Sequence, residues 1–234
     1  MRKEPFSVDN YVHVYNRGNR KQPIVHNVRD QDHFLQMLYY FNAEQIPVAT
    51  FRELNKQRLN LCSFEWPKEW QPRKPIVNII AFTLLENHFH LLLKEIVEGG
   101  IAKFMQKFGT GMTMYYNTKY KESGSLFQGS YKARCVGEDL YLKYLSVYIQ
   151  VKNTFELYPG GLKKAIKEFS KAYDWAVSYP YCSLGDFVGK TNRKIIDKEI
   201  FADIFPHPKE YKEFAHECML GMNLEEKLED FILE

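Results

Sequence analysis

The sequence predicts an α+β protein built on a ferredoxin-like antiparallel sheet flanked by helices, with a helical C-terminal extension. Segments of strand and helix periodicity follow one another as strand, helix, strand, strand, helix, strand, helix, which is the split βαβ order. Two neighbouring apolar runs, separated by a tight turn, indicate an antiparallel hairpin. The clearest break in the chain is Tyr-Pro-Gly-Gly at 158–161, so we expect one domain over residues 1–158 and an extension over 159–234 that packs on it.

Composition indicates an ordinary soluble globular protein. Of the 234 residues, 45% are hydrophobic and 26% are charged, which is enough to form a full core. The net charge of +3 does not by itself establish nucleic-acid binding, but residues 1–80 and 100–135 are locally basic. The four cysteines are scattered without a CxxC pair, which argues against a zinc ribbon and for reduced thiols. With no secretory h-region near the start, we expect a cytoplasmic protein.

The first predicted strand, over 10–16, runs into a strongly basic turn. A basic loop that leaves a strand is suited to reading phosphates and base edges, although a solvated loop is the simpler interpretation of this segment alone. An amphipathic helix is expected over 30–44, ended by Pro47, and 48–74 is irregular with one strand over 59–64. The candidate DNA-binding residues of the turn are Arg17, Asn19, Arg20 and Lys21.

The hairpin over 76–85 and 88–96 holds the most informative pattern of the chain. His88 and His90 are two apart in an apolar strand, so they share one face of the sheet, and Phe89 lies on the other face. Two imidazoles that project from one strand suit a divalent metal ion. Spacing alone supports two interpretations equally: a metal site, and two core or surface histidines with ordinary hydrogen bonds.

The second half of the domain supplies cations and tyrosines. A helix over 99–119 is followed by a strand over 126–136, in which Lys132 and Arg134 share a face. A helix over 137–153 carries Tyr144 and Tyr148 one turn apart on one side, although helical tyrosines are usually core residues with a wet hydroxyl. Further helices are expected over 162–172, 197–204, 208–220 and 224–233.

Five blocks in the same order resemble the REP-associated tyrosine transposases, which belong to the HUH group of single-strand DNA transposases. The likeness covers about residues 8 to 190, which makes it more specific than the histidine pair alone. The blocks are Tyr-Val-His-Val-Tyr-Asn-Arg-Gly-Asn-Arg-Lys-Gln at 11–22, His-Phe-His at 88–90, Leu-Phe-Gln-Gly-Ser-Tyr-Lys at 126–132, Tyr-Ile-Gln at 148–150 and the Trp-to-Gly segment at 175–185.

The resemblance implies an HUH transposase-like catalytic domain over 1–158 that nicks and rejoins single-stranded DNA. In such enzymes Mg²⁺ or Mn²⁺ on the histidine pair, here His88 and His90, polarises the scissile phosphate. The oxygen of Tyr148 would attack phosphorus and form a 5′-phosphotyrosine intermediate. The implied partner is single-stranded DNA with a REP-like hairpin, the implied cations for its phosphates are Lys132, Arg134 and Lys152, and the implied location is the cytoplasm, in association with the nucleoid.

The chain departs from the family pattern just after the tyrosine. The family places a carboxamide, its third metal ligand, one helical turn after the nucleophile, and here that position is Lys152. Asn153 is five residues on, about 140° around an α-helix, so its recruitment requires a local bulge. Gln150 points roughly 200° away. Either Asn153 is the third ligand, or Lys152 replaces part of the metal's charge, or catalysis is impaired.

Other interpretations remain open at this stage. A catalytically impaired member would act as a structured single-strand nucleic-acid binding protein with the same fold and basic loops. An unrelated domain with an accidental histidine pair is disfavoured by the ordered blocks. Tyr144 is the alternative nucleophile, and the protein is expected to be a monomer or a homodimer.

Overall fold

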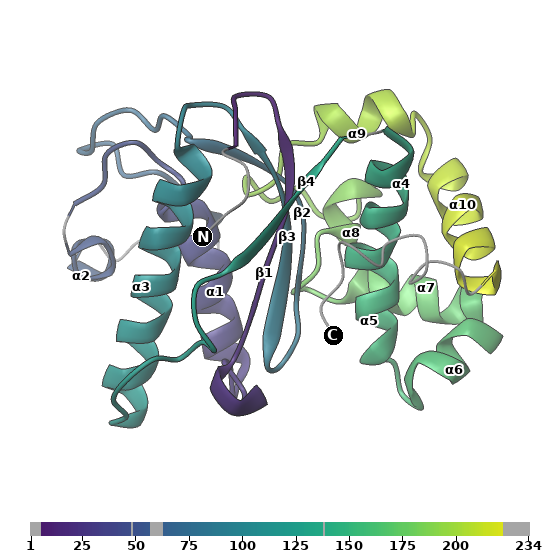
Figure 1. The fold of residues 1–234 in the computed structure, drawn as a ribbon, viewed down its shortest axis with the longest axis horizontal. Coiled ribbons are helices and arrows are strands. Elements are labelled where there is room, and N and C mark those ends of the chain that lie inside the picture. The colour runs from purple at the N-terminus through teal and green to yellow at the C-terminus, as the bar shows by residue number, and fades with distance from the viewer. Residues whose placement is uncertain (1–5, 48, 57–62, 138, 222–234) are drawn as a thin grey trace.

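The fold is organised around one four-stranded antiparallel sheet, with strand order β2-β3-β1-β4 (Figure 1). The computed structural model describes residues 6–47, 49–56, 63–137 and 139–221. Because β1 pairs with both β3 and β4, the sheet has the ferredoxin-like order, and the predicted α+β class is confirmed. The strands are β1 (Tyr11–Arg17), β2 (Val77–Leu84), β3 (His88–Glu95) and β4 (Lys132–Val136).

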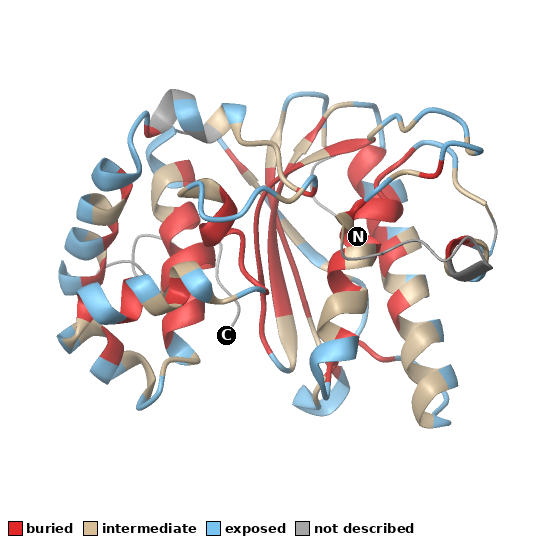
Figure 2. Cartoon of the chain, turned by 180° about the vertical axis from the view of Figure 1, so that it is seen from behind, coloured by how far each residue is buried: buried red, intermediate tan, exposed pale blue. Residues whose placement is uncertain are grey.

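Two long helices cover one face of the sheet (Figure 1). Phe34 and Leu38 from the first of them, Phe89 from β3 and Phe108 from the second are buried together in one apolar cluster. The two central strands are buried along nearly their whole length, as Figure 2 shows. The elements on this side are α1 (Val28–Tyr40), α3 (Gly100–Tyr120) and, at the periphery, α2 (Thr50–Lys56).

The other face is covered by the second half of the chain (Figure 1), and residues of both layers form a second buried apolar cluster. The first helix there is interrupted by a π-helical turn, η3 (Tyr148–Lys152). The remaining elements are α4 (Asp139–Val147), α5 (Asn153–Glu156), α6 (Gly161–Lys167), α7 (Phe169–Ser178), α8 (Leu184–Phe187), α9 (Glu199–Ile204) and α10 (Pro208–Gly221).

The C-terminal extension is joined to the outer strand β2 by backbone hydrogen bonds. The Leu84 amide donates to the carbonyl of Tyr181 at 2.9 Å, and the Ser183 amide donates to that of Phe82 at 3.0 Å. Further along the strand, the Asp197 amide donates to the carbonyl of Ile79 at 2.8 Å. Pairing of this kind satisfies backbone groups that an edge strand would otherwise expose.

Several predicted boundaries were wrong, each for a local reason. Helix α1 begins at Val28, because the Asn27 side chain caps it, and it ends at Tyr40 instead of 44. Helix α2 lies in the stretch predicted as irregular. The strand predicted over 126–136 starts only at Lys132, since 126–131 forms a loop held by a single bridge between Gly18 and Phe127.

Two further predictions fall partly or wholly outside the described residues. Of the strand predicted over 59–64, residues 59–62 are outside them, and 63–64 are not in a strand. The helix predicted over 224–233 lies entirely outside them. Among the helices that the structure does describe, none combines the length and the apolar character that crossing a membrane requires.

Candidate active site

One face of the sheet carries a continuous row of polar side chains. Residues opposite each other in an antiparallel pair project to the same side. In the register, Tyr15 lies opposite His90 and Arg17 lies opposite His88. On the other flank of β1, Lys132 lies opposite Tyr15 and Arg134 opposite His13. The polar residues on this face are therefore His13, Tyr15, Arg17, His88, His90, Lys132 and Arg134, so three of the predicted cations share the face of the histidine pair.

The two histidines are both oriented through their Nδ1 atoms. His88 Nδ1 donates to the Asn87 side-chain oxygen at 2.7 Å, and His90 Nδ1 is 2.9 Å from Nε2 of His13. The rings of His88 and His90 meet edge to face, with centroids 5.2 Å apart. Nε2 of His90 is buried and has no hydrogen-bond partner in the part of the chain that the structure describes. In metal-binding histidines, one ring nitrogen binds the metal and the other binds a protein group that orients the ring. His90 has this arrangement, with Nε2 as the nitrogen left for a metal.

Both imidazoles are held in the neutral form at neutral pH. Burial, reinforced by the nearby charges of Arg17 and Lys152, lowers the pKa of His88 to about 4. Burial, reinforced by His13, His88 and the same two cations, lowers the pKa of His90 well below its ordinary value. Neutral imidazole is the form that binds a metal ion.

Tyr148 reaches this pair from the opposite layer. It is the first residue of η3, it is buried, and its ring lies edge-on to His90 with centroids 5.4 Å apart. The ring of His13 lies 6.3 Å from it, centroid to centroid. Tyr144, one turn earlier, packs its ring on Phe214 of α10, centroids 5.4 Å apart. Of the two candidate nucleophiles, Tyr148 is therefore the one in contact with the histidines.

The π-turn changes which residues follow Tyr148 on its side of the helix. The Tyr148 carbonyl accepts a hydrogen bond from the amide of Asn153, five residues later. In an α-helix its donor would be the amide of the residue four positions later. This turn is the local bulge that recruitment of Asn153 requires. Asn153 is buried, and its amide nitrogen has no hydrogen-bond partner among the described residues. The role of Asn153 as a metal ligand stays a prediction.

Lys152 also lies at the site. Its ammonium is 5.1 Å from the centroid of the Tyr148 ring and forms an ion pair with Glu156 at 2.6 Å. Its charge contributes to the lowered pKa of both His88 and His90. The cation at the expected ligand position therefore faces the site. Within the described residues no group of three or more His, Cys, Asp and Glu side chains is placed to hold a metal ion, so the pair gains no carboxylate ligand.

Gln150 points away from the histidines, as its position in the turn predicts. It is fully buried, its amide nitrogen donates to the Tyr211 hydroxyl at 3.2 Å, and its amide oxygen accepts from Ser183 at 3.0 Å. On the strand side, the hydroxyl of Thr83 donates to the carbonyl of Ile149. The π-turn is thus held by β2 and by two segments of the C-terminal extension.

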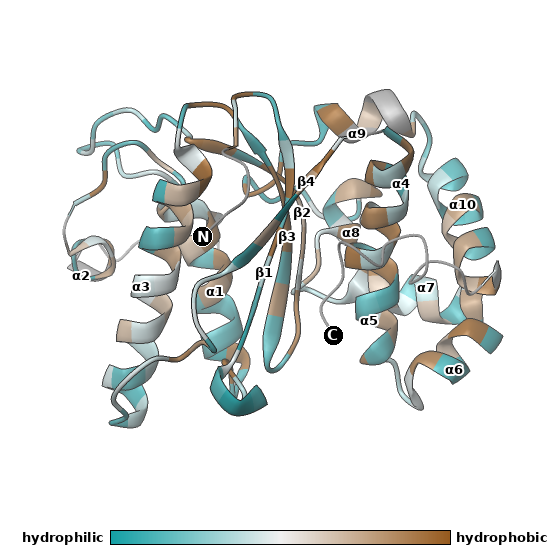
Figure 3. Cartoon of the chain, in the orientation of Figure 1, coloured by the Kyte–Doolittle hydropathy of each residue, from teal (hydrophilic) through white to brown (hydrophobic). Residues whose placement is uncertain are grey.

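The predicted basic loop forms a short 3₁₀ turn, η1 (Asn19–Lys21), at the end of β1. It is purple in Figure 1 and has the teal of hydrophilic residues in Figure 3. All three of its residues are exposed. The Asn19 amide donates to the Leu126 carbonyl at 2.8 Å, and the Asn87 side chain donates to the Lys21 carbonyl at 3.1 Å. Since Asn87 also binds His88, the loop is tied to the histidine pair through one side chain.

The sequence reasoning missed His13 and Tyr15. Both are buried on the active face of β1, with rings 5.1 Å and 5.8 Å from that of His90, centroid to centroid. A signal was present, because His13, Tyr15 and Arg17 alternate along the strand and share a face. The pairing of β1 with β3 was needed to place that face beside His90.

Part of the chain is similar to a known family of transposases. The family model for IS200-like transposases matches residues 56–152. A solved structure of a REP-associated tyrosine transposase bound to a REP hairpin is similar over 83% of this chain and 88% of that one, with 11% identity and a TM-score of 0.41. No curated protein matches the chain.

The matched range runs through β2, β3, α3, β4, α4 and η3, so it contains His88, His90 and Tyr148. These are the residues that carried the resemblance noted in the sequence. The matched family is a transposase family, which indicates a transposase-type activity. The family match agrees with the resemblance noted in the sequence, and residues 56–152 are similar to the IS200-like transposases.

Proposed function

We propose that this protein is a single-strand DNA nickase and strand-transferase that uses Tyr148 as its nucleophile. The observation that carries the proposal is the edge-on contact of the Tyr148 ring with His90, inside the range matched by the transposase family. The contact between Tyr148 and His90 lies within one chain, which supports a site built by a single subunit. We therefore favour a monomer over a homodimer.

The chemistry is a reversible transfer of a phosphoryl group. The Tyr148 oxygen attacks phosphorus, the bond from phosphorus to the 3′ oxygen breaks, and a 5′-phosphotyrosine forms. One proton leaves the phenol and one is taken up by the departing 3′ oxygen. Because a phenol has a pKa of about 10, tyrosine is a better leaving group than an aliphatic alcohol, so a second 3′-hydroxyl reverses the step and joins new ends.

His88, His90 and Asn153 would hold Mg²⁺ or Mn²⁺. The Nδ1 contacts of the two imidazoles, and the Nε2 of His90, which has no hydrogen-bond partner among the described residues, support the histidine ligands. Asn153 would bind through its amide oxygen, and its burial directly after the π-turn supports that role. When bound, the ion supplies Lewis-acid charge at the scissile phosphate. The chain itself holds the imidazoles neutral and fixes their direction.

The cations around the site would bind the DNA strand. Arg17, Lys132 and Arg134 lie on the active face of the sheet, and Lys152 lies above it, so a strand that crosses this face meets positive charge on both sides. The exposed loop at Asn19, Arg20 and Lys21 would contact a flanking hairpin, by analogy with the hairpin-bound relative.

A second candidate function is binding of structured single-stranded nucleic acid without cleavage. Lys152 favours it, because an ammonium beside two imidazoles opposes the binding of a divalent cation. In that case the fold and the cationic face are used, but Tyr148 forms no covalent bond.

The two functions separate in one experiment. The purified protein is incubated with Mn²⁺ and a labelled single-stranded oligonucleotide that carries a hairpin, and covalent adducts are resolved on a denaturing gel. We expect an adduct with the parent and with Tyr144→Phe, and none with Tyr148→Phe. Mass spectrometry of the adduct should place the nucleotide on Tyr148. Retained binding without any adduct, across substrates and metals, would establish the binding function instead.

A further inference from the structure

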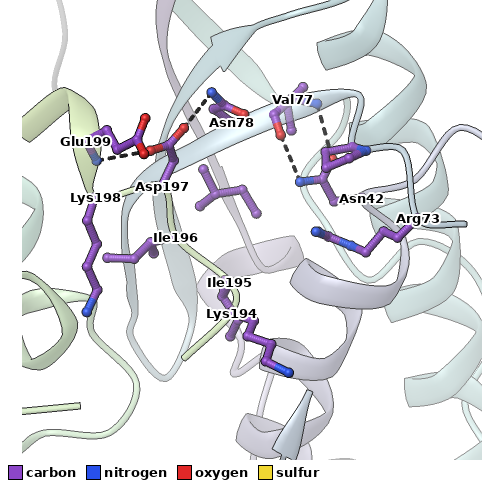
Figure 4. A pocket seen from close by; sticks show the side chains of 12 residues that line it. Asn42, Arg73, Val77, Asn78, Lys194, Ile195, Ile196, Asp197, Lys198 and Glu199 are labelled. Atoms are coloured by element: carbon purple, nitrogen blue, oxygen red, sulfur yellow. Dashed lines mark hydrogen bonds between the residues drawn. The ribbon is translucent and has the colours of Figure 1, made fainter. Parts of the chain in front are cut away.

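A pocket of about 460 Å³ lies beside the outer strand β2, outside the Tyr148 site (Figure 4). Its walls are the segment after α1, the segment that leads into β2 and residues 194–199 of the extension. The side chains that matter for its chemistry are Asn42, Arg73, Asn78, Lys194 and Asp197.

Arg73 contributes an uncompensated positive charge to this pocket. Its guanidinium lies over the ring of Tyr39, 4.4 Å from the centroid, and one NH₂ group reaches the Tyr39 carbonyl at 3.5 Å. Its Nε is buried and has no hydrogen-bond partner, and no carboxylate in the described part of the chain forms an ion pair with it. Burial lowers the pKa of this guanidinium, which shows that its charge is poorly solvated.

Asn42, Asn78 and Asp197 already bind other groups of the protein. The oxygen of Asn42 accepts from the amides of Ile76 and Val77, and its nitrogen donates to the Val77 carbonyl. Asp197 accepts from the Asn78 side chain at 2.7 Å and from the Glu199 amide at 3.1 Å. None of these groups compensates the charge of Arg73.

The pocket is polarised along its length. Asp197, Glu199 and Lys198 lie on one side in Figure 4, and Arg73 lies on the other. The ammonium of Lys198 donates to the Thr191 carbonyl and to the Asn192 side chain, and Lys194 is an exposed residue of the lining. A guanidinium offers a planar fork of donors that matches an oxyanion. The acidic end opposes a continuous run of phosphates, so one anionic group at the Arg73 end fits the charge pattern best.

We propose that this pocket binds a single phosphate group, held by Arg73 with Lys194 at its rim. The group belongs either to a free phosphate anion or to one nucleotide of a nucleic-acid strand whose other phosphates lie outside the pocket. This proposal is independent of the Tyr148 chemistry.

The first test titrates inorganic phosphate into the full-length protein and follows the ³¹P line width. We expect saturable broadening with the parent and with Arg52→Gln, an exposed arginine of α2. With Arg73→Gln, which keeps a donor for the Tyr39 carbonyl but lacks the charge, the affinity should fall at least tenfold. Circular dichroism checks that the variants fold. No saturable binding by the parent, or equal affinity for the parent and Arg73→Gln, would overturn the proposal.

A second measurement needs no variant. Phosphate should slow modification of Arg73 by phenylglyoxal at least fivefold, as mapped by mass spectrometry, and leave Arg52 unaffected. A single-stranded oligonucleotide added to the phosphate-loaded protein distinguishes the sources. If the oligonucleotide displaces the bound phosphate, the site is assigned to a nucleic-acid strand. If the phosphate stays bound, the site is assigned to a free anion. Equal modification of Arg73 with and without phosphate would contradict the site itself.

Discussion

At the scale of single residues, the site depends on side chains that fix or oppose the histidines. His13 contacts the Nδ1 atom of His90, and Asn87 contacts the Nδ1 atom of His88. Both contacts fix the orientation of an imidazole ring and leave its Nε2 atom for a ligand. Lys152 opposes the pair with its charge. Two residue-scale predictions follow from these opposite roles.

His13→Phe should weaken Mn²⁺ binding by about 10- to 100-fold, because the partner that orients His90 is lost. His13→Gln offers an acceptor in place of the imidazole nitrogen and should stay within a few-fold of the parent. Calorimetric titration with Mn²⁺ measures both values. Parent-like affinity of a folded His13→Phe variant would rule out the orienting role.

Lys152→Gln should bind Mn²⁺ about tenfold more tightly than the parent, since it removes a cation from the neighbourhood of both imidazoles. The loss of its pair with Glu156 should cost less than about 1 kcal/mol, because this carboxylate is partly exposed. Lys163→Gln, at an exposed position of α6, is the matched control. Weaker binding by Lys152→Gln would show that Lys152 supports the metal site.

At the scale of elements, the structure fixes its helices by buried polar contacts between them. Gln150 links the π-turn to α10 and to the segment before α8. Asp30 links α1 to the end of α3, where Lys119, Tyr115 and Tyr120 converge on its carboxylate. Each link is tested by a variant of similar volume, which removes the amide of Gln150 or the charge of Asp30.

Gln150→Leu should reduce the kcat of nicking about tenfold and leave the KM for DNA unchanged, because the turn that carries Tyr148 loses its anchor. It should also lower the free energy of unfolding by about 1–3 kcal/mol, since buried partners lose hydrogen bonds. Tyr211→Phe removes one of the two anchors and should show a smaller change of the same kind. A rise in KM at constant kcat would contradict the positioning role.

Asp30→Asn should lower the free energy of unfolding at pH 7 by about 2 kcal/mol. Burial alone would raise the pKa of Asp30, but hydrogen bonds from Lys119, Tyr120, the His26 amide and Tyr115 lower it to about 2. This stabilisation is complete above the unfolded-state pKa of about 4 and is lost as the pH falls through about 2. Urea unfolding between pH 7 and 2 measures it, and the difference between parent and variant should shrink across that window. Asp174→Asn, at an exposed position, should show no such difference.

At the scale of the whole molecule, the extension and the sheet form one packed unit. Arg193 binds the fully buried carboxylate of Asp186 through Nε at 2.8 Å, and its NH₂ group donates to the Cys182 carbonyl at 2.7 Å. Cys182 in turn pairs with Thr83 of β2. The domain boundary predicted at residue 158 stays a prediction.

Arg193→Met should therefore destabilise the whole chain, by about 3–5 kcal/mol, because it leaves a buried carboxylate without its cation. Arg193→Lys keeps the charge without the planar fork and should fall between Arg193→Met and the parent. Chemical denaturation followed by fluorescence measures both, with a single transition expected. Two separate transitions in the parent would show that the extension unfolds independently.

The sheet was largely predictable from the sequence, and the site only in part. Strand periodicity and the hairpin at 76–96 led to the correct strand order, and the spacing of His88 and His90 led to their shared face. The position of His13 depends on cross-strand register, which no local pattern encodes. The π-turn was identified as a requirement for Asn153, but its occurrence depends on contacts from β2 and α10, far away in the chain.

The π-turn has one more consequence, for how such a site changes over generations. A π-turn accommodates one additional residue in a helix. The amide of Asn153 therefore donates to the Tyr148 carbonyl, as the amide of the residue four positions later does in an uninterrupted α-helix. Loss of Lys152 from the chain would close the turn, place asparagine four residues after the tyrosine and remove the cation together. A single codon deletion, with no substitution at all, would thus give the spacing of tyrosine and carboxamide that the resemblance to the REP-associated transposases implies.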